Sequence, residues 1–184
     1  MNKTLLGIIA VVVVVAAILF SSYNGMVTMN ENVTGKWAQV ENQLQRRSDL
    51  VPNLVSTVKG YASHEKEVFQ AVADARAKLS GASTVAEASA ANSQMTSALS
   101  RLLAIAESYP ELKASANFTQ LQDELAGTEN RIAVARKDYN DAVQVFNAKV
   151  KSLPVSLYAG AFGFSPRDYF KADEASQKAP QVKF

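Results

Sequence analysis

A run of 16 residues without a polar side chain, Leu5–Phe20, constrains this chain more than any other feature of its sequence. With Thr4 before it and residues 21–23 after it, the run approaches the ~20 residues that a helix needs to cross a bilayer. A cleavable signal peptide is the alternative, but Ile18-Leu19-Phe20 stands where small residues should precede the cleavage site. We therefore predict an uncleaved transmembrane anchor over residues 1–22, which contacts the lipid bilayer through Leu5–Phe20.

The charges that flank this run predict its orientation. Lys3 precedes it, whereas Lys36 is the only basic residue among the next twenty and is accompanied by Glu31. Because the cytoplasmic flanks of membrane helices carry the excess of Lys and Arg, the sequence predicts a cytoplasmic N-terminus and a body on the extracytoplasmic side.

The composition excludes several classes of site. The chain has no cysteine and one histidine, so it offers no disulfide, thiolate metal site, cysteine nucleophile or intrachain pair of histidine ligands. A formal net charge of +2 gives no bias toward nucleic acid. These counts favour a protein that works by contact.

A second pattern follows the anchor, in which large apolar side chains recur every three or four residues from Val33 to Leu79. Strands alternate instead, so this spacing predicts one helix of roughly 50 residues with a coiled-coil-like seam. Pro52 lies inside it without a loss of phase, which predicts a kink rather than a break. A fresh start capped by Ser48 or Asp49 is the alternative.

Turn and cap residues divide the remainder. Gly81 ends the first helix, and Thr84 with Glu87 forms a capping-box pattern that predicts a second helix over 84–107. Pro110 fits the first turn of a short connector through Lys113. A third helix starts near Ser115 or Asn117 and ends before Pro154, and a short helix at 166–175 is expected in the tail.

The predicted fold class is all-α. It consists of an N-terminal transmembrane helix and a long antiparallel bundle of three main helices, with an aromatic tail packed on the bundle. The corresponding domains are an anchor at 1–22, a bundle at 23–153 and a Gly- and Pro-containing tail at 154–184. Because the helices are unequal, residues ~25–48 lack an obvious intrachain partner, so their seam predicts contact with the aromatic tail or with another copy of the protein.

Two charged residues, Arg47 and Glu65, lie on the apolar seam. A charge there is costly to bury alone. The structural interpretation of Arg47 is an interhelical ion pair or a hydrogen bond to a carbonyl near Pro52. The functional interpretation is contact with an anion, a lipid headgroup or a partner protein. Glu65 has the same two interpretations, since polar seam residues often fix register.

No residue pattern predicts catalysis. His64-Glu65 resembles half of a zinc-protease motif, but Val68 stands where its second histidine should be. Four further carboxylates are interpreted as part of a solvated face: Glu107, Asp123, Glu124 and Glu129. We predict a protein that is not an enzyme and has no catalytic residue, metal site, cofactor or small-molecule substrate. The predicted interaction surface consists of Trp37, Arg46, Arg47, Pro52, Glu65, Tyr158, Phe162, Phe164, Tyr169 and Phe170.

Several long blocks of the chain resemble the LemA family of bacterial membrane proteins. They are Tyr23-Asn24, residues 37–65, residues 106–143, Phe146-Asn147 and the ending from Tyr169 to Phe184, whereas residues 80–98 match little. The resemblance implies one N-terminal membrane helix, an all-helical body and no established catalytic residues. Relatives in this family are associated with magnetosome membrane formation, and genes of the family often lie beside the gene of a membrane zinc metalloprotease.

The leading functional hypothesis is a non-enzymatic scaffold, single-pass in the bacterial cytoplasmic (inner) membrane, that self-associates and presents its bundle to a protein partner. The alternative is an adaptor or regulator of a membrane metalloprotease or of an envelope signalling protein. The predicted partners are therefore the bilayer, a second copy of the chain and a membrane protein, without nucleic acid.

Overall fold

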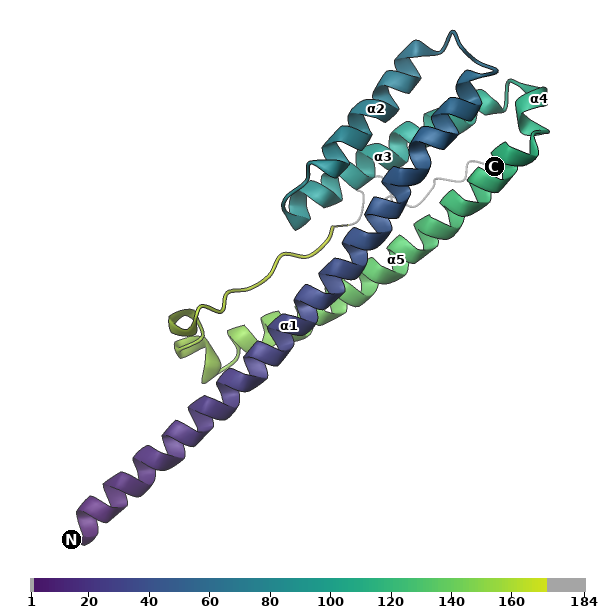
Figure 1. Cartoon of the computed structure of the whole chain (residues 1–184). Coiled ribbons are helices and arrows are strands. Elements are labelled where there is room, and N and C mark those ends of the chain that lie inside the picture. Colours follow the sequence, from purple (N-terminus) through teal and green to yellow (C-terminus); the bar gives the residue numbers. More distant parts are fainter. Residues whose placement is uncertain (1, 172–184) are drawn as a thin grey trace, which may run out of the picture. The chain divides into compact units, whose positions relative to one another are not determined.

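The computed structural model describes residues 2–171, and this part of the chain contains helices and no strand. The all-helical prediction is therefore confirmed for these residues (Figure 1). The α-helices are α1 (Lys3–Lys59), α2 (Lys66–Ser80), α3 (Val85–Ala106), α4 (Pro110–Lys113) and α5 (Ala116–Lys151), and two 3₁₀ turns follow at Val155–Leu157 and Gly160–Phe162.

The apolar run forms the start of α1, a helix of 57 residues. This part of α1 is long and apolar enough to cross a membrane, and no residue of its most apolar window is buried. Pro52 lies inside α1, which continues to Lys59. The helix therefore does not restart at Ser48 or Asp49.

The first helix of the body does not continue to Leu79, so this prediction was wrong. α1 ends at Lys59, and a turn over residues 60–65 leads into α2. The end of the helix is tightened at this turn, where the amides of Tyr61 and Ala62 both donate to the carbonyl oxygen of Val58. The apolar side chains keep their 3–4 spacing across the turn because α1 and α2 each bury one apolar face with the helical repeat of 3.6 residues. The spacing of apolar residues therefore does not reveal that the chain reverses direction between the two helices.

The later elements match the expected ones closely. The Thr84 hydroxyl accepts the amide of Glu87, and the Glu87 carboxylate accepts the amides of Ser83 and Thr84, which completes the predicted capping box. These hydrogen bonds hold the pKa of Glu87 below its usual range. Pro110 begins the short α4, as predicted.

The described chain divides into two compact units. One comprises α1 up to Lys36 together with Asn140–Arg167. The other comprises Trp37–Tyr139 together with the described residues from Asp168 onward. This division leaves the domain boundaries expected at 22 and 153 as predictions.

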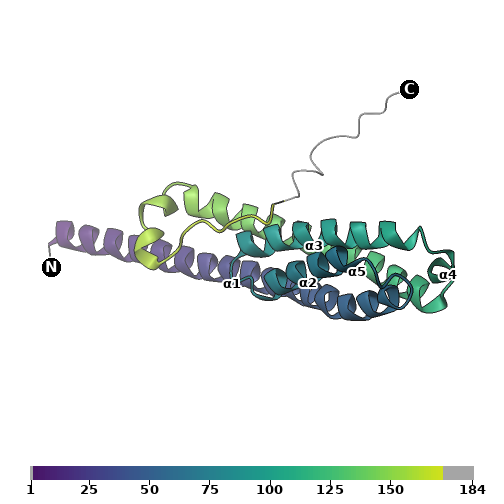
Figure 2. The ribbon, with the colours of Figure 1, turned by 90° about the horizontal axis from the view of Figure 1, so that it is seen from above.

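In the second unit, four stretches of helix follow one another in alternating directions: α1, α2, α3 and α5 (Figures 1 and 2). The expected count was three, and the turn at residues 60–65 adds the fourth. With four passes instead of three, α5 runs opposite to α1. The buried core of this unit is supplied by Val40, Leu54, Val58, Val72, Met95, Leu102, Leu112, Phe118 and Ile132.

The first unit supplies an intrachain partner for the early seam. Its buried residues come from α1, from the end of α5 and from the 3₁₀ turns: Met26, Val33, Val143, Phe146, Val150, Val155 and Ala159. Of the two partners expected for this seam, the aromatic tail contributes here through Val155 and Ala159. Burial of these seam residues therefore does not need a second copy of the chain.

The short helix expected at 166–175 is absent from its described part, residues 166–171, and the rest lies outside the described residues. In place of helical hydrogen bonds, side chains of α3 and α5 donate to the carbonyl oxygens of Arg167, Asp168 and Lys171. Gly163, with φ of 80°, ends the second 3₁₀ turn in a left-handed conformation that glycine adopts without strain.

Candidate functional site

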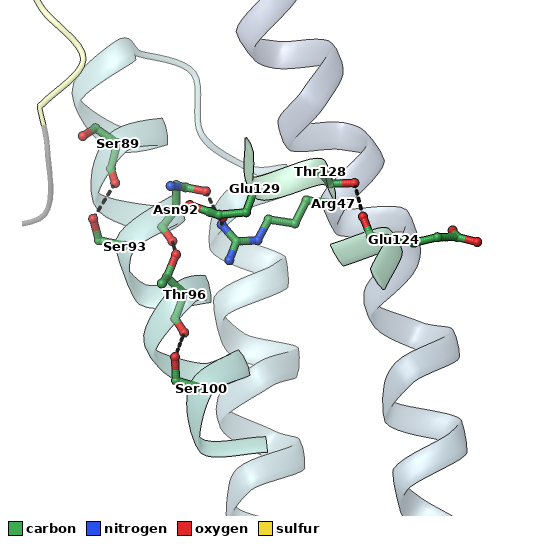
Figure 3. A network of polar contacts seen from close by, with 9 residues as sticks. All are labelled: Arg47, Ser89, Asn92, Ser93, Thr96, Ser100, Glu124, Thr128 and Glu129. Carbon is green, nitrogen blue, oxygen red and sulfur yellow. Dashed lines mark hydrogen bonds and ion pairs between the residues drawn. The ribbon is translucent and has the colours of Figure 1, made fainter. Parts of the chain in front are cut away.

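Arg47 is the buried centre of a polar network that connects three helices of the second unit (Figure 3). Its Nη1 atom donates to Asn92 Oδ1 of α3 at 2.9 Å and lies 2.7 Å from Glu129 Oε2 of α5. Burial lowers the pKa of Arg47, and the negative charge of Glu129 opposes that shift. The guanidinium therefore makes an interhelical ion pair, one of the two structural interpretations that the sequence left open.

Asn92 and Glu129 were missed as partners of Arg47. Asn92 lies in the Ala- and Ser-rich stretch of α3, where small residues let the helices approach closely and no motif marks a ligand. Glu129 was interpreted as part of a solvated face, and its side chain is indeed 43% exposed. The available sequence signal was its neighbour Thr128, which continues the 3–4 apolar spacing between Leu125 and Ile132 and is buried in the structure.

The other structural interpretation of Arg47, a hydrogen bond to a carbonyl near Pro52, is not what its side chain makes. A different residue, Arg76, binds that carbonyl. In an α-helix the amide of residue 52 would donate to the carbonyl of residue 48. Proline has no such hydrogen, so the Ser48 carbonyl loses its partner within the helix. Arg76 Nε of α2 donates to this oxygen at 3.0 Å. Pro52 thereby creates the acceptor that attaches α2 to α1.

A double-mutant cycle tests this link. We expect Arg76→Met to lower the free energy of unfolding by about 1 kcal/mol, because the Ser48 carbonyl then has no donor. In the Pro52→Ala background, the introduced alanine supplies an amide hydrogen, so the same change should cost less than half as much. Thermal unfolding of the four full-length proteins in detergent, followed by circular dichroism, measures the coupling. Equal costs in both backgrounds would contradict the assignment.

In the second unit residues 168–171 contact the helices through backbone carbonyls and through the Phe170 ring. Tyr139 Oη donates to the carbonyl of Asp168 at 2.8 Å, and Ser89 Oγ donates to that of Lys171 at 2.9 Å. The buried Phe170 ring lies 6.3 Å from Trp37 and 4.7 Å from the Arg136 guanidinium. Buried Phe170 and half-buried Trp37, both predicted for the interaction surface, thus contact each other within the same chain.

In the first unit the Asn147 side chain both donates a hydrogen bond to the tail backbone and accepts one from it. Its Nδ2 donates to the carbonyl of Arg167 at 2.8 Å, and its Oδ1 accepts the Arg167 amide at 2.7 Å. The Arg167 side chain in turn donates to Asn30 Oδ1 at 2.9 Å. Asn147 was noted only as part of a sequence block, since nothing in the sequence says which backbone a buried amide will bind.

Three aromatic rings of the tail that were predicted for the interaction surface lie near Tyr23 of α1. Tyr23 lies 5.4 Å from Phe162 and 5.7 Å from Phe164, measured between ring centres, and Tyr158 lies 5.7 Å from Phe162. Tyr158 Oη hydrogen-bonds Ser22 Oγ at 2.8 Å. These residues form one aromatic cluster, to which Tyr23 contributes a ring that was not predicted.

The remaining predicted surface residues are not drawn into these clusters. Arg46, Pro52 and Tyr169 are exposed, and Glu65 is half-buried at the N-terminal end of α2. Within residues 2–171, no group of three or more His, Asp or Glu side chains could hold a metal ion.

Most of the chain matches a known protein family. The model of the LemA family matches residues 36–184. The chain belongs to the LemA family. The resemblance seen in the sequence is therefore confirmed, and it covers the body rather than the anchor.

Among curated proteins, this LemA family member is similar to magnetosome proteins. It is 29% identical to Magnetosome protein MamQ 2 of Paramagnetospirillum magneticum over 91% of this chain and 72% of that protein. It is 28% identical to Magnetosome protein MamQ of Magnetospirillum gryphiswaldense, over 89% and 71% respectively. With the apolar start of α1, these relatives indicate a membrane-associated protein that has one candidate spanning helix among its described residues.

Proposed function

We propose that this protein is a non-enzymatic, membrane-anchored helical scaffold that self-associates and presents an interaction surface at the bacterial cell envelope. The observation that carries this proposal is α1, a single helix whose first part is apolar and exposed and whose later residues, including Val40 and Leu54, belong to a buried core. One element thus provides both the anchor and part of the body. Membership of the LemA family and similarity to magnetosome proteins support a role at a membrane.

The surface that supports self-association is a hollow between α1 and α5 in the second unit. It is lined by Gln39, Gln43, Asn130, Arg131, Val134, Ala135 and Asp138. Val134, one of the lining residues, is 62% exposed and offers its apolar side chain to a partner. Such a hollow fits an apolar helix face of a partner.

Symmetry makes a second copy the partner that this surface fits best. Arg131 and Asp138 are seven residues apart on α5, with Val134 and Ala135 midway between them. If two copies pair antiparallel about that midpoint, Val134 of each copy lies opposite Ala135 of the other, and Arg131 of each copy lies level with Asp138 of the other. A two-fold interface requires such a self-complementary patch.

Substitution of Val134 tests whether this surface forms the interface between two copies. We expect Val134→Asp to convert an oligomer into a monomer, because the change buries two unpaired carboxylates at the two-fold axis. Light scattering of the detergent-solubilised full-length protein measures the mass. Ala133→Asp is the matched control: it adds the same charge to the same helix at an exposed position outside the hollow.

The chain contains no cysteine, so Val134→Cys offers a second readout of the same interface. In isolated membranes this variant should form a disulfide-linked dimer on mild oxidation, whereas Ala133→Cys should form far less. A wild-type protein that stays monomeric at every concentration would contradict self-association. One-to-one co-purification with a membrane protein would then favour the adaptor role instead.

We further place the body on the extracytoplasmic side of the cytoplasmic membrane. The support is the charge that precedes the apolar run, Lys3, set against a single Lys36 after it. Protease digestion of spheroplasts tests this placement, since an extracytoplasmic body is degraded without lysis and a cytoplasmic one is protected.

A further inference from the structure

The two most exposed large apolar side chains among residues 2–171 stand four positions apart in the segment after α5. Leu153 is 77% exposed and Leu157 is 79% exposed, although each stands in a well-defined turn. We call residues 152–163, which contain both 3₁₀ turns, the foot. An exposed apolar pair of this kind marks a surface that is covered by something else.

The position of the foot along α1 identifies what could cover it. The foot is fixed to α1 by the hydrogen bond between Tyr158 and Ser22 and by the contact between the Phe162 and Tyr23 rings. Ser22 stands two residues beyond Phe20, the end of the apolar run, which is about 3 Å along a helix axis. Figures 1 and 2 both show the foot beside α1. If α1 crosses the bilayer, the foot lies at its surface.

A groove connects the foot with the apolar part of α1. Its lining includes Val14 and Ile18 from the apolar run, Val155 and Tyr158 from the foot, and Lys149 from the last turn of α5. The foot and the lipid-facing helix therefore share one continuous surface. Tyrosine rings beside it are typical of the membrane–water interface, where one end of the ring is apolar and the other is hydrated.

Charge complements this apolar surface. Lys149 and Lys151 lie in the last turn of α5, immediately before the foot. Basic residues next to a membrane are attracted to anionic lipid headgroups. The segment thus presents two leucines next to two lysines, the pattern of an element that lies in a bilayer interface.

We propose that the foot is a second membrane-contacting element of this protein, in which Leu153 and Leu157 enter the acyl region of the leaflet and Lys149 and Lys151 meet anionic phosphates. This proposal rests on α1 crossing the bilayer and is independent of self-association. The foot is covered by lipid of the same membrane that α1 crosses. If a second copy of the protein covers the two leucines instead, the experiment below detects it.

The experiment uses the absence of cysteine in the natural chain. Single variants Leu153→Cys and Leu157→Cys of the full-length protein are labelled with an environment-sensitive fluorophore and reconstituted in phosphatidylcholine–phosphatidylglycerol vesicles. We expect blue-shifted emission that is quenched by lipids brominated near the carbonyl end of the acyl chain. Val145→Cys is the matched control, because Val145 is an exposed apolar residue of α5 in the same unit. Its label should remain in water.

The other outcomes each decide the question. Emission at 153 and 157 that is blue-shifted but not quenched would mean that protein covers the leucines, and emission like that of the Val145 label would mean that water does; both overturn the proposal. A label at Val12→Cys reports the anchor separately, through quenching by lipids brominated near the methyl end. The Lys149→Gln/Lys151→Gln variant should lose quenching at 153 when phosphatidylglycerol is present. Unchanged quenching would overturn the role of the lysines.

Discussion

Replacing Phe170 by alanine is expected to lower the free energy of unfolding by about 3–5 kcal/mol. The ring is only 2% exposed, although it belongs to a segment without regular secondary structure. Its removal leaves a cavity beside Trp37 and takes away the contact of the ring with the Arg136 guanidinium. Thermal unfolding of the full-length protein in detergent measures the loss, which corresponds to a fall in Tm of roughly 6–20 °C for a chain of this size.

The neighbouring residue is the natural control. Tyr169 is also aromatic and was also predicted for the interaction surface, but it is 45% exposed. Tyr169→Ala should therefore change stability by less than about 1 kcal/mol. Equal effects of the two substitutions would show that Phe170 does not anchor this segment in solution.

The second large effect is expected at the buried ion pair. Glu129→Gln should lower the free energy of unfolding by about 3 kcal/mol, the lower end of the range for breaking a buried pair, because half-exposed Glu129 is already partly solvated. The variant leaves the charge of Arg47 buried among neutral groups only, Asn92 and the introduced glutamine amide. Chemical denaturation of the full-length protein in detergent, with the transition midpoint as the readout, checks the value.

Two further variants separate charge from shape at this site. Asp123→Asn makes the same kind of change at an exposed position of α5 and should be nearly neutral. Adding Arg47→Met to Glu129→Gln removes the uncompensated charge and should restore part of the lost stability. If the double variant is less stable than Glu129→Gln alone, the cost comes from lost packing and not from an unpaired charge.

Local signals in the sequence predicted local structure well. The pairing of Thr84 with Glu87 and the place of Pro110 each depend on residues within one helical turn, and both are found as expected. The long apolar run likewise determines the start of α1 by itself. These features need no knowledge of the rest of the chain, because the interacting groups are sequence neighbours.

Features that depend on distant residues were predicted poorly or not at all. The turn at Gly60 was overlooked because α1 and α2 bury faces of the same period, so the number of helices was one too few. Arg47 was recognised as costly to bury, but its partner Glu129 lies 82 positions further along the chain, and many carboxylates could have met it. The same holds for Arg76, which binds the Ser48 carbonyl. That carbonyl is left without a helical donor because Pro52 lacks an amide hydrogen.

The contacts that join the tail to α1 also order events during synthesis. Tyr158 and Ser22 are separated by 136 positions, so at about 5–20 residues per second Ser22 waits roughly 7–27 s before its partner is made. Throughout this interval the apolar run is already available to the membrane insertion machinery, while the residues that later cover the base of α1 do not yet exist. The first unit can close only after the anchor has had time to enter the bilayer.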